Sequence, residues 1–465
     1  MDAAEFGGGG LTITKFIASV CVASLFGLVA CNGNASSFVP TSGSGSNATP
    51  RGATPFVALQ GALPTPIEHV VIIDQENRTP DYLFQGIPGA DIAKTAIDSH
   101  GNTVQLQEVS LGAPYDLDHS HKAFVKDYND GKMDGFDRGM SPKKHLRPFG
   151  YAPESEVKPY HDMAKQYAFA DHMFESNQGP SFPSHLYIVS GTATDKQISD
   201  DRVAENPRDS VTGKLRGGGC DAPDTTLVRT IVLVSGVPGP RVHPCFDRPV
   251  LSDFLDQKSV SWRYYEDFLG AGLWHPFDAI YHVRYGKDYA NVMSPPESIL
   301  TDISQGRLAG VTWVTPDGAH SDHAGQHGNT GGPSWVAAIV NAIGHSQYWK
   351  TTAIFVTWDD WGGWYDHVPP QMLNHYELGF RVPLVVISPY AKHGYVSKVP
   401  HEFGSILAFT EETFGIPKGA LQATDERADD LKDAFNFGQK PRRFVTIKAP
   451  PFHPSTSTSI GDEDP

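Results

Sequence analysis

One stretch of the chain, residues 352–370 (TAIFVTWDDWGGWYDHVPP), constrains the fold more than any other. It opens with an apolar, β-branched run (AIFV), which is typical of a strand buried on both faces. The run leads to two adjacent carboxylates, Asp359 and Asp360, and a Gly-Gly turn then precedes the pair Asp366-His367. Because open α/β sheets bind ligands at the carboxyl ends of their strands, this order predicts a ligand site at the strand end. The alternative is a polar loop that only caps the strand.

The remaining periodic segments predict an α/β fold. Three further apolar runs are typical of buried strands, and three amphipathic stretches are typical of helices. The expected strands are 69–73, 308–314 and 382–387, and the expected helices are 157–169, 334–343 and 405–414. Strands that alternate with helices predict a mainly parallel central sheet sandwiched by helices. Residues 195–245 are rich in Gly, Arg, Asp and Pro, which predicts an inserted cap or loop region with a short strand at 230–234.

Length and charge bound the domain organisation and the partners. The chain has 465 residues, a net charge of −16 with neutral His, and no run rich in Lys or Arg, so we expect no nucleic-acid partner. We expect one globular domain over 64–437. A Ser-, Gly- and Pro-rich flexible linker is expected at 32–63, and a loosely ordered tail at 438–465.

The first 31 residues are typical of an export signal. Lys15 precedes an apolar stretch at 16–30, which is short for a membrane span and ends in Leu-Val-Ala-Cys31. This ending resembles the lipobox of bacterial lipoproteins, so we expect residues 1–31 to be a lipoprotein signal peptide and lipobox. A lipid on Cys31 would then anchor the exported protein to the membrane of the bacterial cell envelope. The alternative, an ordinary secretory signal cut nearby, also predicts export.

Cysteine use agrees with export. Outside the signal segment the chain has Cys220 and Cys245, each beside loop-type residues. Two cysteines in an exported domain favour a disulfide. A metal site is the alternative, but these cysteines lack the close C-x-x-C spacing that such sites prefer.

Two predicted strands end on oxygen ligands. The strand at 69–73 runs into Glu76 and Asn77, just as the strand of the acidic stretch runs into Asp359 and Asp360. Carboxylate and amide oxygens suit hard or borderline divalent cations, so these four residues predict a site for one divalent metal ion. Any one of them alone is more often a turn residue.

Ser181 and two histidines are the candidates for catalysis. Ser181 lies between prolines in NQGPSFPSHLYIVSG, and a hydroxyl beside a metal can act as a nucleophile; the alternative is a helix N-cap. His119 in DLDHSH and His323 in PDGAHSDHAGQH supply candidates for proton transfer to a leaving oxygen or for contact with a phosphoryl oxygen. Most histidines have only a structural or solvated role, and His323 is favoured because it follows a predicted strand.

Together these motifs resemble a bacterial phosphoesterase family that contains phospholipases C and related acid phosphatases and has the alkaline phosphatase superfamily fold. The resemblance covers about 67–417 and is carried by seven segments: ENRTPDYLFQG, HSHKAFVKDYNDGKMDGF, PYHDMAKQYAFADHMF, GPSFPSHLYIVSG, SDHAGQHG, TWDDWGGWYDHVPP and FRVPLVVISPYA. It implies an alkaline-phosphatase-like fold, a divalent metal held by Glu76, Asn77, Asp359 and Asp360, and Ser181 as nucleophile and further ligand. It also implies that His119 and His323 contact the phosphoryl group.

The chain departs from the family pattern at three places. Pro80 replaces a Phe, and Ser184-His185 replace Asn-Arg after the nucleophile. Ser181 and Asp360 stand where the phospholipases tend to have Thr and Glu, which favours the acid phosphatase branch.

The sequence therefore predicts hydrolysis of phosphoric esters through a phosphoseryl intermediate, with a small phosphate ester as the substrate. The first alternative is a phospholipase C that releases phosphorylated head groups from phospholipids. The second is a non-catalytic surface lipoprotein that uses the fold for binding.

Overall fold

The computed structural model describes residues 65–196, 199–325 and 330–454. Its centre is an eight-stranded sheet with the order β13-β12-β14-β1-β15-β16-β6-β17. These strands are β1 His69–Gln75, β6 Ala168–Ala170, β12 Trp262–Tyr265, β13 Val292–Met293, β14 Val311–Val314, β15 Thr352–Trp358, β16 Leu384–Ile387 and β17 Tyr395–Ser397. Only the pairings of β16 with β15 and with β6 are antiparallel within this sheet. The predicted mainly parallel α/β sheet is confirmed.

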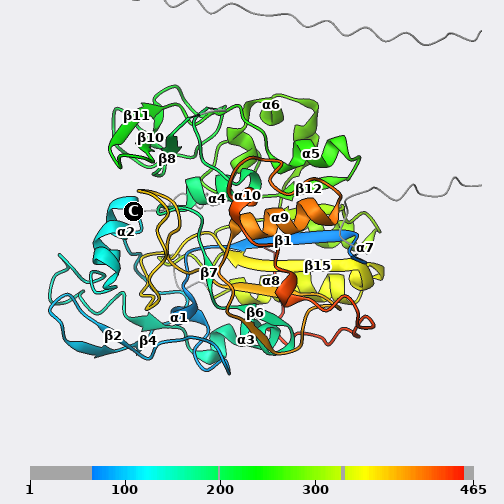
Figure 1. Cartoon of the computed structure of the whole chain (residues 1–465), viewed down its shortest axis with the longest axis horizontal. Coiled ribbons are helices and arrows are strands. Elements are labelled where there is room, and N and C mark those ends of the chain that lie inside the picture. The colour runs from blue at the N-terminus through cyan, green and yellow to red at the C-terminus, as the bar shows by residue number, and fades with distance from the viewer. Residues whose placement is uncertain (1–64, 197–198, 326–329, 455–465) are drawn as a thin grey trace, which may run out of the picture. The chain divides into compact units, whose positions relative to one another are not determined.

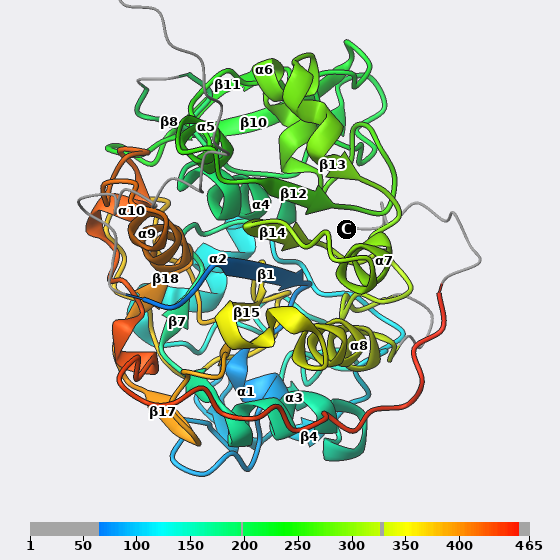
Figure 2. The same cartoon turned by 90° about the vertical axis from the view of Figure 1, so that its right-hand side faces the viewer.

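Helices cover both faces of this sheet, as Figures 1 and 2 show. On β15, Trp358 packs against Tyr160 of α3 (Glu154–Gln166), and Phe355 packs against Phe409 of α9 (Phe403–Thr413). Because successive side chains of a strand alternate between faces, these two contacts lie on opposite sides of the sheet. The other long helices are α2 His121–Tyr128, α4 Ser181–Ser190, α5 Leu251–Gln257, α7 Ser298–Ser304 and α8 Gly332–Gly344. The predicted sandwich of a sheet between helices is confirmed.

Shorter elements complete the described chain. They are α1 Pro80–Leu83, α6 Tyr281–Arg284, α10 Thr424–Arg427, β2 Thr95–Ile97, β3 Thr103–Gln105, β4 Gln107–Glu108, β5 Gly150–Tyr151, β7 Met173–Phe174 and β18 His401–Glu402. None of the described helices is both long and apolar enough to cross a membrane.

The predicted element boundaries need two corrections. The strand predicted from residue 308 starts at Val311, and the helix predicted to continue to residue 169 ends at Gln166. The reason for the second difference is that Ala168–Ala170 form the buried strand β6, which pairs with β16. Tertiary pairing has overridden a locally helical pattern.

The register between β1 and β15 positions the functional residues. The two strands are parallel neighbours, and Gln75 pairs with Trp358 at their carboxyl ends. The amide of Asp359 then donates to the carbonyl oxygen of Gln75 at 3.0 Å, so the residues that follow each strand begin at the same level. The acids that the sequence places far apart are therefore brought to one edge of the sheet.

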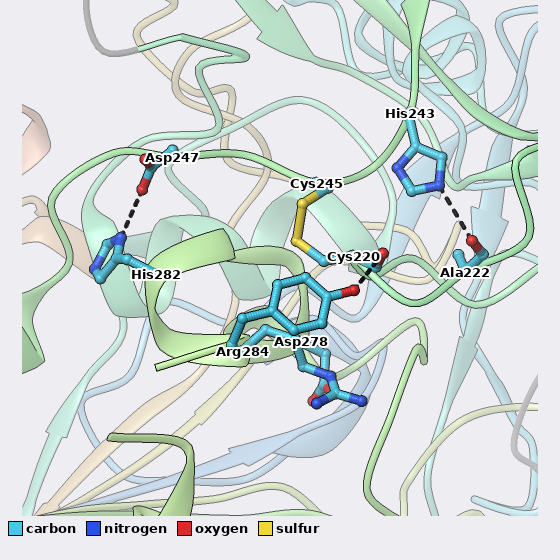
Figure 3. The surroundings of a disulfide bond; sticks show 9 residues. Cys220, Ala222, His243, Cys245, Asp247, Asp278, His282 and Arg284 are labelled. Carbon is cyan, nitrogen blue, oxygen red and sulfur yellow. Dashed lines mark hydrogen bonds and ion pairs between the residues drawn. A yellow bond between two sulfur atoms is a disulfide. The ribbon is translucent and has the colours of Figure 1, made fainter. Parts of the chain in front are cut away.

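The region predicted as an insertion has a sheet of its own. It contains β8 Asp201–Val203, β9 Arg208–Asp209, β10 Thr226–Val232 and β11 Pro238–Val242, all antiparallel. The predicted Cys220–Cys245 disulfide is present, and it joins residues that are 25 apart in the sequence (Figure 3). The Tyr285 hydroxyl donates to the Cys220 carbonyl at 3.0 Å, so the bridged segment also contacts the chain after α6. The short strand expected at 230–234 corresponds to β10.

The packed chain extends beyond the expected domain boundary at residue 437. Ile447 is buried, and its backbone exchanges two hydrogen bonds with the Asn341 side chain on α8, at 2.8 and 2.9 Å. The Trp349 indole donates to the Arg442 carbonyl at 2.8 Å. Residues 438–454 thus lie against the domain without regular secondary structure. The expected signal peptide (1–31), the linker (32–63) and the end of the tail (455–465) lie outside the described residues.

Candidate active site

The predicted oxygen ligands meet where β1 and β15 end. Glu76, Asn77, Asp359 and Asp360 are all buried, and the Asn77 amide N–H donates to Asp359 Oδ1 at 2.8 Å. Asn77 has φ = 60°, a left-handed conformation that asparagine tolerates better than most residues. This turn bends the chain directly after β1 and points the Glu76 carboxylate toward the acids of β15.

The side-chain amide of Asn77 bridges the acids and a histidine. One end of the amide lies 2.9 Å from Glu76 Oε2 and 3.2 Å from Asp359 Oδ1, and the other end lies 3.1 Å from His119 Nε2. With its NH2 toward the acids, Asn77 donates to both carboxylates. With its oxygen toward them, three oxygens face one another, and a cation between them would stabilise this arrangement.

Ser181 lies in the same cluster. It is the first residue of α4, and its Oγ is 3.3 Å from both Glu76 Oε2 and Asp360 Oδ2. The N-cap of α4 is Pro180, and no side chain caps this helix, so the alternative role of Ser181 as an N-cap is not observed. The serine hydroxyl instead faces two carboxylates from two different strands.

His119 and His323 stand side by side at this edge of the sheet. The Nδ1 of His119 contacts the Leu117 carbonyl at 2.7 Å, and that of His323 contacts the Ala324 carbonyl at 2.6 Å. A carbonyl partner fixes the proton on Nδ1 of a neutral imidazole, which makes Nε2 the basic atom. The two ring centroids are 6.0 Å apart. Both predicted histidines are therefore part of the cluster.

Three further residues of the cluster were not predicted. His185, one turn after Ser181 on α4, has Nε2 3.0 Å from Glu76 Oε1 and Nδ1 3.1 Å from Asp74 Oδ2. Glu175 and Asp74 are also buried, and the charges of Asp360 and Asp359 act on both. Asp74 and His185 had a local signal, because Asp74 lies two residues before Glu76 at the end of β1, and Ser181 and His185 share one face of α4.

The site concentrates buried negative charge. Burial raises the pKa of Asp74 and Glu76 well above the usual range, and the charge of Asp359 raises both further. Burial also raises the pKa of Glu175, with a contribution from Asp360. Among the described residues, the ion pairs of Asp74, Glu76 and Asp359 involve only His185, with no lysine or arginine. Such a cluster favours protonation or the binding of a cation.

The geometry fits a metal ion. Single ligand atoms of Glu76, His185 and Asp359 lie within 4.8 Å of one another, and all three residues are buried. Asp359 Oδ2 has no hydrogen-bond partner in the described structure. A buried carboxylate oxygen without a donor is costly, and a divalent cation would satisfy it.

The Asp366-His367 pair of the acidic stretch contacts other residues. Asp366 forms two contacts with the Arg381 guanidinium, at 2.8 and 3.0 Å, and both residues are buried. His367 Nδ1 contacts Asp81 Oδ2 at 2.8 Å, and Asp81 also lies 3.5 Å from Arg381. This second cluster contains its own cation and lies outside the Ser181 cluster.

Comparison with known proteins confirms the predicted resemblance. The model of the Phosphoesterase family matches residues 67–417, which is most of the chain. A non-hemolytic phospholipase C of Pseudomonas aeruginosa is 24% identical, with 80% of this chain and 57% of that protein covered. A phospholipase C B of Mycobacterium tuberculosis is also 24% identical, with 81% of this chain and 79% of that protein covered.

The chain spans just over half the length of the Pseudomonas relative. Among solved structures, a protein of the alkaline phosphatase superfamily from Vibrio parahaemolyticus aligns over 80% of this chain and 72% of its own, with 11% identity and a TM-score of 0.39.

Proposed function

This chain belongs to the Phosphoesterase family, and we propose that it is a metal-dependent hydrolase of phosphoric esters with Ser181 as its nucleophile. One observation carries the proposal. The Ser181 hydroxyl lies 3.3 Å from a carboxylate after β1 and 3.3 Å from a carboxylate after β15, in a fully buried cluster. Within the described residues, the ion pairs of Glu76 and Asp359 include no lysine or arginine. A serine held among such acids is poorly suited to stability alone, but it suits a metal-activated nucleophile.

Glu76, Asn77, Asp359, Asp360 and Ser181 would hold one divalent metal ion, and His185 is a further candidate ligand. When bound, the ion lowers the pKa of the serine hydroxyl and neutralises charge on the phosphoryl oxygens. The oxygen-rich ligand set favours a hard or borderline cation.

The residues divide the chemistry between them. Ser181 Oγ attacks phosphorus and gives its proton to Glu76 or Asp360, the two carboxylates that it contacts. The bond between phosphorus and the substrate's alcohol oxygen breaks, and that oxygen takes a proton from Nε2 of His119 or His323, which starts this step as the imidazolium. Water then attacks phosphorus and gives a proton to the same histidine. The bond between phosphorus and Ser181 Oγ breaks, and the serine oxygen takes back its proton from the carboxylate. The product is phosphate, or a phosphate monoester from a diester. Positioning and charge stabilisation supply most of the rate in such transfers.

Replacing the nucleophile tests this mechanism. We expect Ser181→Ala to lower hydrolysis of a small aryl phosphate by about 10³-fold or more, because the covalent route is lost. The matched control is Ser388→Ala, another buried serine, whose hydroxyl donates to the Thr352 carbonyl at the start of β15. Activity of Ser181→Ala at the level of this control would refute the nucleophile assignment.

The substrate class separates two forms of the proposal. Ser181 and the Asp359-Asp360 pair favour a small phosphate monoester, as in an acid phosphatase. The named phospholipase C of Mycobacterium tuberculosis, covered over 79% of its length, favours release of a phosphorylated head group from a phospholipid. Parallel rates on an aryl phosphate and on phosphatidylcholine vesicles decide between them, and activity on neither would leave the fold as a binding module.

Export and lipid anchoring complete the proposal. They are supported by the sequence before residue 32, which ends in the lipobox-like Leu-Val-Ala-Cys31. If Cys31 carries a lipid, Cys31→Ser will move the protein from the membrane fraction to the soluble fraction of the bacterial envelope. An unchanged distribution would contradict the anchor.

A further inference from the structure

A polar cavity lies at the end of α4 opposite to Ser181. It has a volume of about 680 Å³, which is in the range of small-molecule sites. Its walls come from the chain after α4, from β8, from the segment before α5 and from α10, which lie near one another in Figure 2. The residues from α10 lie beyond residue 417, where the match to the Phosphoesterase family ends.

Three arginines line this cavity, and two of them are already neutralised. Arg427 contacts Glu377 at 2.7 Å and Glu402 at 2.8 Å. Arg202 contacts the same Glu377 at 3.4 Å. The carboxylates of Glu377 and Glu402 therefore compensate the cations of this wall.

Arg248 is the third arginine, and its hydrogen bonds go only to neutral groups. It is 3% exposed, and it donates to the Ser190 hydroxyl at 3.3 Å and to the Thr194 carbonyl. Its Nη2 has no hydrogen-bond partner in the described structure. Burial lowers the pKa of this guanidinium to about 9, which reflects the cost of a desolvated cation.

Among the described residues, no ion pair joins Arg248 to Asp195, the acid whose charge acts on it. The charge of Asp195 raises the pKa of Arg248. Asp195 itself forms an ion pair with Lys196 at 3.9 Å, and neither carboxylate oxygen of Asp195 accepts a hydrogen bond among the described residues. The guanidinium of Arg248 also lies over the Phe246 ring, 5.2 Å from its centroid, but a buried guanidinium without a carboxylate partner is costly unless a charged acceptor binds it. The Thr424 hydroxyl also lines the cavity and is buried, and it has no hydrogen-bond partner among the described residues.

We propose that this cavity is a second ligand site, separate from the Ser181 cluster, for the oxyanion of a small polar molecule. Arg248 Nη2 donates to the anion, and the Thr424 hydroxyl donates alongside it. The chemistry fits a phosphate or a carboxylate group, since a guanidinium binds both through paired oxygens. A cavity of this volume also has room for a polar body attached to the anionic group.

Calorimetric titration of the full chain with inorganic phosphate, and separately with succinate, tests the site. We expect Arg248→Met to weaken binding to the cavity roughly tenfold or more, because a charge-assisted hydrogen bond is lost. Thr424→Val, which keeps the side-chain shape, should weaken it several-fold and provides the test if the methionine variant does not fold. The stronger of the two probes identifies the kind of oxyanion.

Two controls separate this site from the candidate active site. Arg241→Met, at an exposed arginine of β11, should leave anion binding unchanged. Asp360→Asn should abolish hydrolysis of an aryl phosphate yet keep the Arg248-dependent binding. The proposal is overturned if Arg248→Met and Thr424→Val bind both anions as the wild type does. It stands even if Ser181→Ala shows that the catalytic proposal is wrong.

Discussion

Two buried acid clusters begin from the same short stretch of chain, and they differ in one respect. Asp359 and Asp360 face Glu76 and Ser181, and in the part of the chain that the structure describes, Asp359 and Glu76 form ion pairs with His185 and with no arginine or lysine. Asp366, seven residues after Asp359, faces the buried guanidinium of Arg381 at 2.8 Å. Both groups are surrounded by carboxylates and histidine, and both have ligand atoms close enough to hold a metal.

The difference shows how burial can serve either structure or chemistry. In the Arg381 cluster burial also raises the pKa of Asp366, but the Arg381 guanidinium lowers it and pairs with this carboxylate within the chain. In the Ser181 cluster burial and mutual repulsion raise the pKa of Asp74 and Glu76, and a cation is needed for these acids to be ionised together. A buried acid cluster is therefore a candidate metal site mainly where no lysine or arginine of the chain pairs with its carboxylates.

We expect the largest effect on activity from a substitution in the Ser181 cluster. Asp360→Asn removes one carboxylate beside Ser181, and we expect aryl phosphate hydrolysis to fall by about 10³-fold or more. Metal content, measured by elemental analysis, should fall with it. The fold should survive, because the change also removes a buried like charge. Full metal occupancy with full activity would contradict the site.

The matching substitution in the Arg381 cluster should lower stability and leave activity unchanged. Asp366→Asn leaves the Arg381 guanidinium buried against an uncharged amide, and we expect a loss of about 3–5 kcal/mol in the free energy of unfolding. Denaturant titration measures this loss. Metal content and the rate per folded molecule should stay near the wild type, so a loss of metal here would erase the distinction between the clusters.

Chelation compares the two clusters in one experiment. Metal bound to the native state stabilises it by about 2.7 kcal/mol at a concentration 100 times its Kd. We therefore expect a chelator to lower the melting temperature of the wild type and of Asp366→Asn, but not of Asp360→Asn. Equal shifts in all three proteins would place the metal outside the Ser181 cluster.

Asp127 on α2 is a buried acid with one partly exposed cation beside it, so its pairing is intermediate between the two clusters. We expect its substitution to have the smallest effect on stability. It is buried beside the partly exposed Lys126, 3.1 Å away, and burial raises its pKa to about 7 despite this partner. Because the folded pKa exceeds the unfolded one, the stability contribution is present at low pH and is lost as pH rises through about 7. Asp127→Asn should flatten the stability curve by ~1–3 kcal/mol between pH 4 and 8. An unchanged pH profile in denaturant titrations would contradict the shift.

Much of the site had a local signal in the sequence. Apolar runs that end on oxygen-bearing side chains predicted β1, β15 and the meeting of Glu76 with Asp359, because parallel neighbours bring their carboxyl ends to one edge. The spacing of two on a strand and four on a helix could also have indicated Asp74 and His185. Glu175 had no such pattern, since its burial near Asp360 depends on contacts with the distant Phe380 segment.

The sequence by itself determined the residue types and the buried strands that deliver them, because burial and backbone periodicity are local properties of the chain. Tertiary structure alone decided which acids receive a cation from the chain and which do not. Asp366 pairs with the guanidinium of Arg381, a charge from a later segment, whereas the ion pairs of Glu76 and Asp359 within the described residues are with His185. Packing also placed Arg248 at a cavity, and residues 438–454 on α8, through contacts between segments that no local pattern connects.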